Sequence, residues 1–447
     1  MSATPTDTPE ASFSLVDTRS FATVSLLLAQ LYGSTLFDRS AKGGFMQDQF
    51  GNSVTCTSPS ALAAYDRAVD AHLHAWPGVF EALDEALATE PDFALAHALH
   101  ALVLAIWGQG KEARAAVSRA QAAPHDDGRE NSLIELIATI CRGRSMDALK
   151  HVIDHARAWP TDALAASTAL GAYGLFAFSG CLDHDAARLA FSDALAPHFP
   201  ENFPWVMANR GWARIEVGRK EEGMAMVQRA LTLRPTNAHT AHMLMHGFYE
   251  LGRAHDALDF VSQWLPSYPQ GLLWGHLHWH ASLAEVELGQ TQKALQRLLG
   301  PIAEFLPMNV PYMGLPDIIS LAWRLGLLGV ANLPWTLAQQ HVKKHFPKGS
   351  NVFGELHLVM LAAARGDRSA LDATCRRADA MANAGHAGAA IVSHWAQALR
   401  ALMDGDEAAA RAQLDAACEG APRVGGSHAQ RMVMEETRHA LRIPLAT

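Results

Sequence analysis

The sequence predicts an all-α protein in which helical hairpins are stacked as a solenoid. Long segments rich in Ala, Leu, Arg, Gln and Glu place their apolar residues three and four positions apart, which is the spacing of an amphipathic helix. Alternating runs of Val, Ile and Thr, which would predict strands, are almost absent. A third observation, a repeat centred on glycine, indicates how the helices are organised.

The repeat consists of a glycine followed five residues later by a small residue. Gly218, Gly252 and Gly289 begin three consecutive copies, which are 34 and 37 residues apart. We expect each glycine where one helix ends and the next begins, and the small residue lets the second helix approach the first closely. The best match runs from Gly211 to Pro235, and the period predicts tetratricopeptide-like units. The pairs are Gly108/Ala113, Gly143/Ala148, Gly218/Gly223, Gly252/Ala257, Gly289/Ala294 and Gly405/Ala410.

The spacing breaks down around residues 160–195 and 300–390, where extra prolines and altered glycine positions occur. This predicts an irregular α/α solenoid that is strongly curled or closed on itself. Residues 1–58 are expected to be a loop-rich segment that ends at Ser58, a good cap for a helix beginning at Pro59. The repeat array is expected over residues 59–440, followed by a short tail at 441–447.

Composition excludes several classes of protein. The chain has 447 residues, of which 49% are hydrophobic, and a formal net charge of −9. The apolar content excludes a largely disordered chain, and the acidic balance argues against nucleic-acid binding. No apolar run is long enough for a membrane span, and the first residues lack the pattern of a signal peptide. The five cysteines are scattered without a CxxC pair, which favours reduced thiols and a cytoplasmic location.

Histidine is unusually frequent, since its 23 copies outnumber Phe, with 17, and Tyr, with 6, taken separately. His242 and His246 are four residues apart and share one helix face, and His276 and His280 repeat that spacing. The two pairs are 34 residues apart, which is the repeat period. Because equivalent positions of stacked repeats are neighbours, the four imidazoles should form one patch. A further step of 37 residues from His280 reaches Asp317.

Three chemical roles are compatible with this patch. Imidazole is the commonest protein ligand for transition metals, so the four histidines would hold a divalent ion such as Zn, Fe or Ni. Histidine also titrates near neutral pH, so the same groups would act as general acids and bases. In the third role they are hydrogen-bonded polar residues packed in the core. No Glu directly follows His242 or His276, which argues against an HExxH metalloprotease.

Six motifs suggest a known family. They are Arg129-Glu130; Ala241-His242…His246…Glu250-Leu251-Gly252-Arg253; His276…Trp279-His280; Asp317-Ile318-Ile319-Ser320-Leu321-Ala322-Trp323-Arg324-Leu325; Phe353-Gly354-Glu355-Leu356-His357; and Gly425-Gly426-Ser427-His428-Ala429-Gln430-Arg431. In these motifs the chain resembles the tetratricopeptide repeat protein 38 family over roughly residues 45–440, and the last motif is the most specific. The resemblance implies a helical-repeat fold and candidate site residues, but no established reaction.

The glycine-rich turn at Gly425 and Gly426 can approach the histidine patch in a curled solenoid, because its small residues allow close backbone contact. Such an approach would enclose a polar pocket of titratable groups, the usual setting of a functional site. Alternatively, the turn is a structural cap of the last helix, which Ser427 begins. The predicted catalytic residues are His242, His246, His280, His428 and Asp317; the predicted substrate-binding residues are Arg324, Arg431, Trp279 and His357; the alternative metal ligands are His242, His246, His276 and His280.

Two functions from different classes remain open. The first is an enzyme of the hydrolase or lyase type, which acts on a small molecule and uses an arginine to orient an anionic substrate. The second is a non-catalytic scaffold that binds a peptide or protein. A closed array with an interior pocket favours the enzyme, whereas an open groove favours the scaffold. The exposed ends of a solenoid also favour a homodimer.

Overall fold

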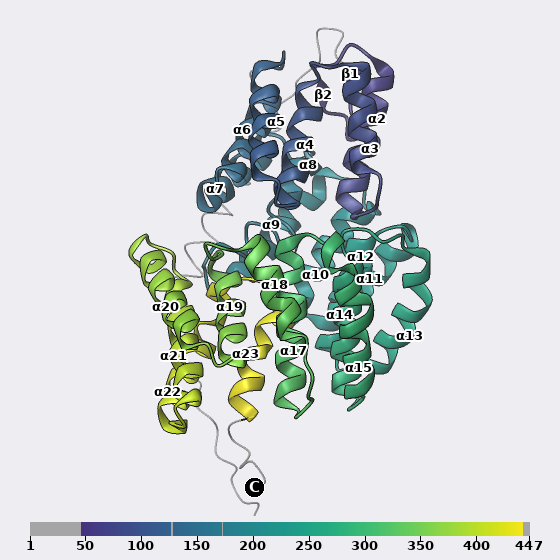
Figure 1. Ribbon diagram of the computed structural model, residues 1–447. Helices are drawn as coiled ribbons and strands as arrows, with labels where there is room; N and C mark the ends of the chain where they lie inside the picture. Colours follow the sequence, from purple (N-terminus) through teal and green to yellow (C-terminus); the bar gives the residue numbers. More distant parts are fainter. Residues whose placement is uncertain (1–45, 127, 172, 441–447) are drawn as a thin grey trace, which may run out of the picture. The chain divides into compact units, whose positions relative to one another are not determined.

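The computed structural model of the chain describes residues 46–126, 128–171 and 173–440 (Figure 1). These residues are almost entirely helical, and the strands among them, β1 (Met46–Gln47) and β2 (Ser53–Val54), form one antiparallel pair. The prediction of an all-α fold is therefore confirmed. Of the predicted N-terminal segment and C-terminal tail, residues 1–45 and 441–447 lie outside the described residues.

Most helices follow one another as pairs joined by short turns, and the two helices of a pair pack together. The first described helix begins at Pro59, as predicted, because the Ser58 side chain accepts a hydrogen bond from the Ala61 N–H and caps it. The helices are α2 (Pro59–His74), α3 (Val79–Thr89), α4 (Ala94–Ile106), α5 (Gly110–Ala122), α6 (Arg129–Cys141), α7 (Ser145–Ala158), α8 (Ala163–Ser167), α9 (His184–Leu195), α10 (Pro204–Glu216), α11 (Lys220–Leu233), α12 (Ala238–Glu250), α13 (Ala254–Trp264), α14 (Trp274–Glu287), α15 (Thr291–Arg297), α16 (Ala303–Phe305), α17 (Pro311–Leu327), α18 (Trp335–His345), α19 (Val352–Ala364), α20 (Arg368–Asn383), α21 (Ala389–Met403), α22 (Glu407–Glu419) and α23 (His428–Ala440).

The repeated glycines sit at the turns between paired helices. Gly218, Gly252 and Gly289 have φ angles of 88°, 63° and 70°, in the left-handed region that favours glycine at a helix end. The small residues allow close packing: a Cβ atom on Gly211 would lie 2.8 Å from the carbonyl oxygen of Gly223 on the next helix. The left-handed turn and the close helix packing together explain the repeat of a glycine and a small residue.

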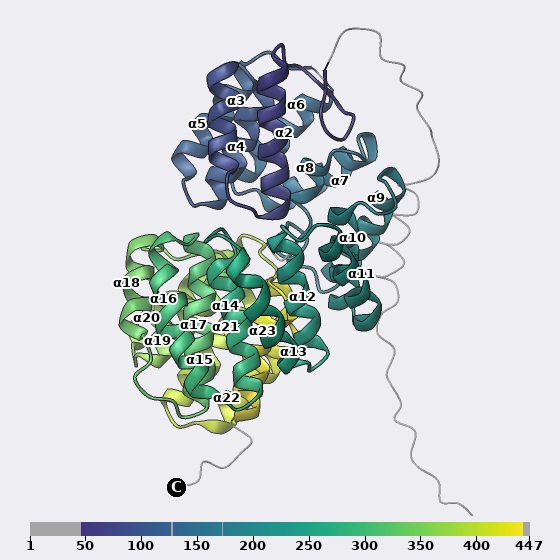
Figure 2. The ribbon, with the colours of Figure 1, turned by 90° about the vertical axis from the view of Figure 1, so that its right-hand side faces the viewer.

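The first helices of consecutive pairs contact one another, which is the defining packing of a solenoid. α10 packs on α12, α12 on α14, α14 on α17, and α17 on α19 (Figure 2). Buried apolar side chains around Trp212, Phe248 and Leu277 form one of the core clusters and hold α10, α12 and α14 together. Equivalent turns of α12 and α14 consequently face each other.

The irregularity predicted around residues 160–195 is present, and that predicted for 300–390 is confined to the start of the region. α8 has only five residues, and a turn-rich connection leads from it to α9. Beyond α15, the chain forms a π-helical turn at Leu298–Ile302, where Gly300 has non-helical backbone angles and Pro301 lacks a backbone donor. Regular stacking resumes at α17, so these irregularities interrupt the period without ending the array.

The last helix returns to the middle of the array. α23 packs against α17 and α12 as well as against its neighbour α22. These contacts join segments that are far apart in the sequence, and they agree with the predicted curled arrangement. Among the described helices, none has both the length and the apolar character needed to cross a lipid bilayer.

Candidate functional site

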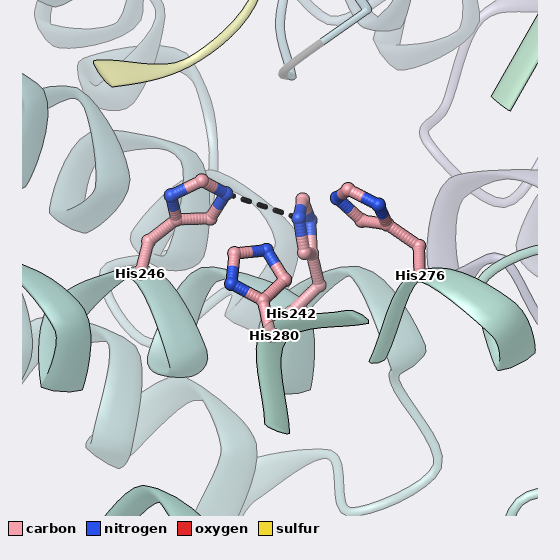
Figure 3. Close-up of side chains that lie close together, drawn as sticks. All are labelled: His242, His246, His276 and His280. Carbon is pink, nitrogen blue, oxygen red and sulfur yellow. Dashed lines mark hydrogen bonds between the residues drawn. The ribbon is translucent and has the colours of Figure 1, made fainter. Parts of the chain in front are cut away.

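Four histidines from two neighbouring helices meet in the interior (Figure 3). α12 supplies His242 and His246, and α14 supplies His276 and His280. Each histidine contributes one ring nitrogen to a group of four nitrogens that all lie within 4.8 Å of one another. All four side chains are buried. We call these four residues the histidine cluster. They meet because α12 and α14 are equivalent helices of adjacent repeats.

The four rings pack edge against face. The ring centroids of His246 and His280 are 4.5 Å apart, and those of His242 and His276 are 4.8 Å apart. The Nε2 atoms of His242 and His246 are 3.0 Å apart, so one of them donates a hydrogen bond to the other. The Nε2 atom of His280 is buried without a hydrogen-bond partner among the described residues. Ring nitrogens therefore face one another, an arrangement that a central cation would stabilise.

Asp317 on α17 holds His276 in place. Its Oδ1 lies 2.7 Å from the His276 Nδ1, and both side chains are 1% exposed. Because a carboxylate accepts hydrogen bonds, His276 donates from Nδ1, and Nε2 is the ring nitrogen left to bind a metal ion. Trp279 stacks on the His276 ring at 5.1 Å between centroids and donates its N–H to Ser320. A carboxylate that fixes the tautomer of an imidazole is typical of metal-bound histidines.

Glu216, at the end of α10, is a second acidic neighbour, which the sequence analysis did not identify. Its side chain is fully buried, and its Oε1 lies 3.7 Å from the Nδ1 of His246. Burial raises the pKa of this carboxyl group above its ordinary value. Glu216 precedes Glu250 by 34 residues, so the register that located the histidines also marks this position.

The cluster favours neutral imidazoles. Burial lowers the pKa of His242, His246 and His280 well below the ordinary value, and repulsion from neighbouring rings acts in the same direction. These three rings are therefore uncharged at neutral pH. Each keeps a lone pair on one nitrogen, which is the state that binds a metal ion.

We expect the protein to lose stability as the pH falls below about 6.5, the ordinary pKa of histidine. A histidine whose pKa is lowered by folding contributes stability that is fully present above its unfolded pKa. That stability is lost at lower pH, because the unfolded chain takes up protons that the folded chain does not. Urea unfolding between about pH 7.5 and pH 5.5 measures the loss. A His242→Gln/His280→Gln variant should show a shallower dependence, and an equal slope in both proteins would contradict this explanation.

The C-terminal turn reaches the neighbours of the histidine cluster, not the cluster itself. The His428 side chain is 45% exposed, and its Nδ1 lies 2.6 Å from Oε1 of Glu250. The hydrogen bond with Glu250 raises the pKa of His428. Arg431 contacts Asp185 at 3.4 Å and donates to the carbonyl oxygen of Gly426. The structure therefore places neither His428, predicted as catalytic, nor Arg431, predicted as substrate-binding, among the four rings, because carboxylates hold both side chains elsewhere.

Arg324 and His357, also predicted to bind substrate, are both buried. The Arg324 guanidinium lies 5.6 Å from the centre of the Trp279 ring and donates to Glu436 at 2.6 Å and to a backbone carbonyl. Its Nη1 has no hydrogen-bond partner among the described residues. His357 binds a backbone carbonyl through Nδ1, and burial lowers its pKa to about 4. Arg324 therefore lies beside the cluster, next to Trp279, whereas the contacts of His357 within the described residues are with Phe353 and include no ring of the cluster.

Fold and site together define a helical-repeat protein with a buried histidine cluster flanked by two carboxylates. No protein-family model matches the chain. Among solved structures, it is similar to the P58(IPK) TPR domain (14% identity, 87% of this chain, 90% of that chain, TM-score 0.22). It is also similar to yeast Tom70 (10% identity, 84% of this chain, 86% of that chain, TM-score 0.29). A third similar structure is Naa15/Naa10 bound to HypK-THB (12% identity, 87% of this chain, 64% of that chain, TM-score 0.21). With TM-scores this low, the helical-repeat assignment rests on the helix packing described above.

Proposed function

We propose that the protein binds a divalent transition-metal ion through His242, His246, His276 and His280. The observation that supports the proposal is the convergence of four ring nitrogens within 4.8 Å in the interior. A tetrahedral ion with metal–nitrogen distances of about 2.0–2.1 Å holds its ligands roughly 3.3 Å apart. The cluster contains one pair at 3.0 Å, so small side-chain rotations would close it around an ion.

The surroundings support a cation. An imidazole ligand brings no negative charge to a divalent ion, and Asp317 and Glu216 lie directly behind two of the proposed ligands. Carboxylates in this outer position orient the imidazoles and raise their basicity. An all-nitrogen set suits Zn, Cu, Ni or Fe, because oxygen ligands are preferred by Mg and Ca.

The reaction class predicted from the sequence, hydrolysis or elimination, stays a prediction. Four protein ligands complete a tetrahedral shell, whereas a catalytic ion keeps a position for water or substrate. Acid–base catalysis by the rings alone has less support, because efficient general acids and bases have a pKa near the working pH. The pKa values of His242, His246 and His280 are instead well below that range.

The second candidate function is a binding scaffold. A surface cavity of about 580 Å³ on α2 and α3 is lined by Trp76, by four acidic residues (Asp66, Asp70, Glu81 and Glu85) and by Arg67, which pairs with Glu85. Its volume lies in the range of ligand sites, about 300–1,000 Å³. An aromatic ring beside carboxylates suits a basic peptide side chain.

Four further points stay predictions. They are membership of the tetratricopeptide repeat protein 38 family, a cytoplasmic location, a small-molecule ligand and a homodimer.

Metal analysis of the purified protein tests the first proposal. After incubation with zinc, nickel or copper salts and removal of unbound ions, we expect one tightly bound ion per chain. X-ray absorption should show nitrogen ligands without sulfur. The control is His278→Ala. His278 lies on α14, like His276 and His280, but its side chain contacts Arg297 and is not one of the proposed ligands. Metal-free wild-type protein would contradict the proposal and leave the scaffold as the better explanation.

A further inference from the structure

The N-terminal end of α23 contacts a carboxylate that touches the histidine cluster. The backbone N–H of His428, the first residue of α23, donates to Oε2 of Glu216 at 3.1 Å. The other carboxylate oxygen, Oε1, faces the Nδ1 of His246 at 3.7 Å. Oε1 has no hydrogen-bond partner among the described residues. One fully buried side chain therefore joins a ring of the cluster to the last helix.

A second contact runs from the same segment to α14. The Gln430 amide donates to the Tyr173 hydroxyl at 3.3 Å, and the Tyr173 ring lies edge-on to His276 with centroids 6.2 Å apart. The Gln430 side chain also accepts a hydrogen bond from the Ser427 backbone N–H. The C-terminal segment thus approaches one histidine of α12 and one of α14 through a single intermediate residue each.

The backbone of this segment is built for a close approach. Gly425 and Gly426 have φ angles of 92° and 79°, which disfavour any residue with a side chain. A Cβ atom on Gly426 would lie 2.6 Å from the Phe353 ring, and one on Gly425 would meet the Phe178 ring. The two glycines therefore allow α23 to begin directly against the surroundings of the cluster.

We propose that Glu216 is a positioning residue for His246 and that it couples metal binding to the docking of α23. The inference rests on the proposed metal site. An ion bound to the Nε2 of His246 strengthens the attraction between that ring and the Glu216 carboxylate. The ring then fixes the orientation of the carboxylate, which keeps Oε2 aimed at the His428 N–H. Coupling of this kind is reciprocal. If bound metal favours the docking of α23 by a given factor, then docking of α23 raises the metal affinity by the same factor.

Glu250 provides a matched control. It also holds α23, through the 2.6 Å contact with His428, and it is paired with Lys220 at 3.3 Å. Among the described residues, the Glu250 side chain contacts His428 and Lys220 and no ring of the histidine cluster. Glu250→Gln should therefore loosen α23 without changing the coupling, whereas Glu216→Gln should weaken the coupling itself.

The experiment is hydrogen exchange of the α23 amides with and without saturating zinc, combined with zinc affinity from chelator competition. In wild-type protein, zinc should slow exchange in α23 by about tenfold or more. Glu216→Gln should bring this ratio close to one and weaken zinc binding by about 10–100-fold, the usual effect of losing an outer-shell partner. In Glu250→Gln, exchange should be faster with and without zinc, and the ratio should stay near the wild-type value.

The outcomes separate the two proposals. Zinc that binds to wild-type protein without slowing exchange in α23 overturns the coupling and leaves the metal site intact. Unchanged zinc affinity in a folded Glu216→Gln variant overturns the positioning role. Failure of wild-type protein to bind zinc, nickel or copper overturns the metal site and the coupling together. The wild-type ratio decides the coupling even if Glu216→Gln does not fold.

Discussion

Removal of metal by a chelator is expected to lower the unfolding temperature of the wild-type protein and to leave a His242→Ala/His280→Ala variant unchanged. An ion that binds only the folded chain adds RT ln(1 + [L]/Kd), about 4 kcal/mol at a thousandfold excess over Kd. The double variant keeps one ligand on each of α12 and α14, too few for a stable site. Thermal unfolding of metal-loaded and chelator-treated samples measures the difference.

His278→Ala again serves as the control for this result. His278 lies on α14, is 8% exposed and contacts Arg297 at 3.0 Å, outside the cluster. The variant should keep the chelator-dependent shift of the wild-type protein. A shift that survives in His242→Ala/His280→Ala would place the metal elsewhere in the chain.

Asp162→Ala is expected to destabilise the protein by about 3–5 kcal/mol, the usual cost of removing one partner from a buried ion pair. Arg129 and Asp162 are 2.6 Å apart, with side chains 7% and 3% exposed. Although burial acts to raise it, the charge of Arg129 holds the pKa of Asp162 below its ordinary value. Asp162 also caps α8 by accepting the Ala165 N–H. Truncation would strand a buried guanidinium that also holds the Ser53 carbonyl oxygen.

A surface pair nearby provides the comparison for Asp162→Ala. Asp154 and Arg157 are 2.7 Å apart, but their side chains are 50% and 29% exposed. Asp154→Ala should cost no more than about 1 kcal/mol, because solvent screens exposed pairs. Urea unfolding of both variants measures the contrast. Similar losses in the two variants would show that burial is not the cause.

Local regularity explains what could be predicted from the sequence. The interval of 34 residues between His242 and His276 sufficed to place four rings together, because stacked repeats convert an interval in sequence into a neighbour in space. The step of 37 residues that led to Asp317 also reached the site. Asp317 contacts His276, although the step was counted from His280, because the irregular turn before α17 alters the register.

The remaining contacts come from non-repeating parts of the chain. His428 meets Glu216 across 212 positions, and Gln430 meets Tyr173 across 257. No period connects these residues, so their pairing depends on how the array turns back. The two glycines of the C-terminal turn predict a close approach of the backbone. Its contact with Glu216 could not be deduced, because a repeat pattern specifies neighbouring units and not the return path of the chain.

The return of α23 also changes how the array should come apart. In an open solenoid, each repeat is held by nearest neighbours alone, so unfolding can start at either end and proceed unit by unit. Here the hydrogen bond between His428 and Glu216 joins two residues 212 positions apart and so closes a loop of the chain that contains α12 and α14. An ion bound by both helices would form a second cross-link inside that loop. Detachment of α23 would then break a contact beside the histidine cluster. The stability of the last helix is therefore expected to depend on whether the histidines hold an ion.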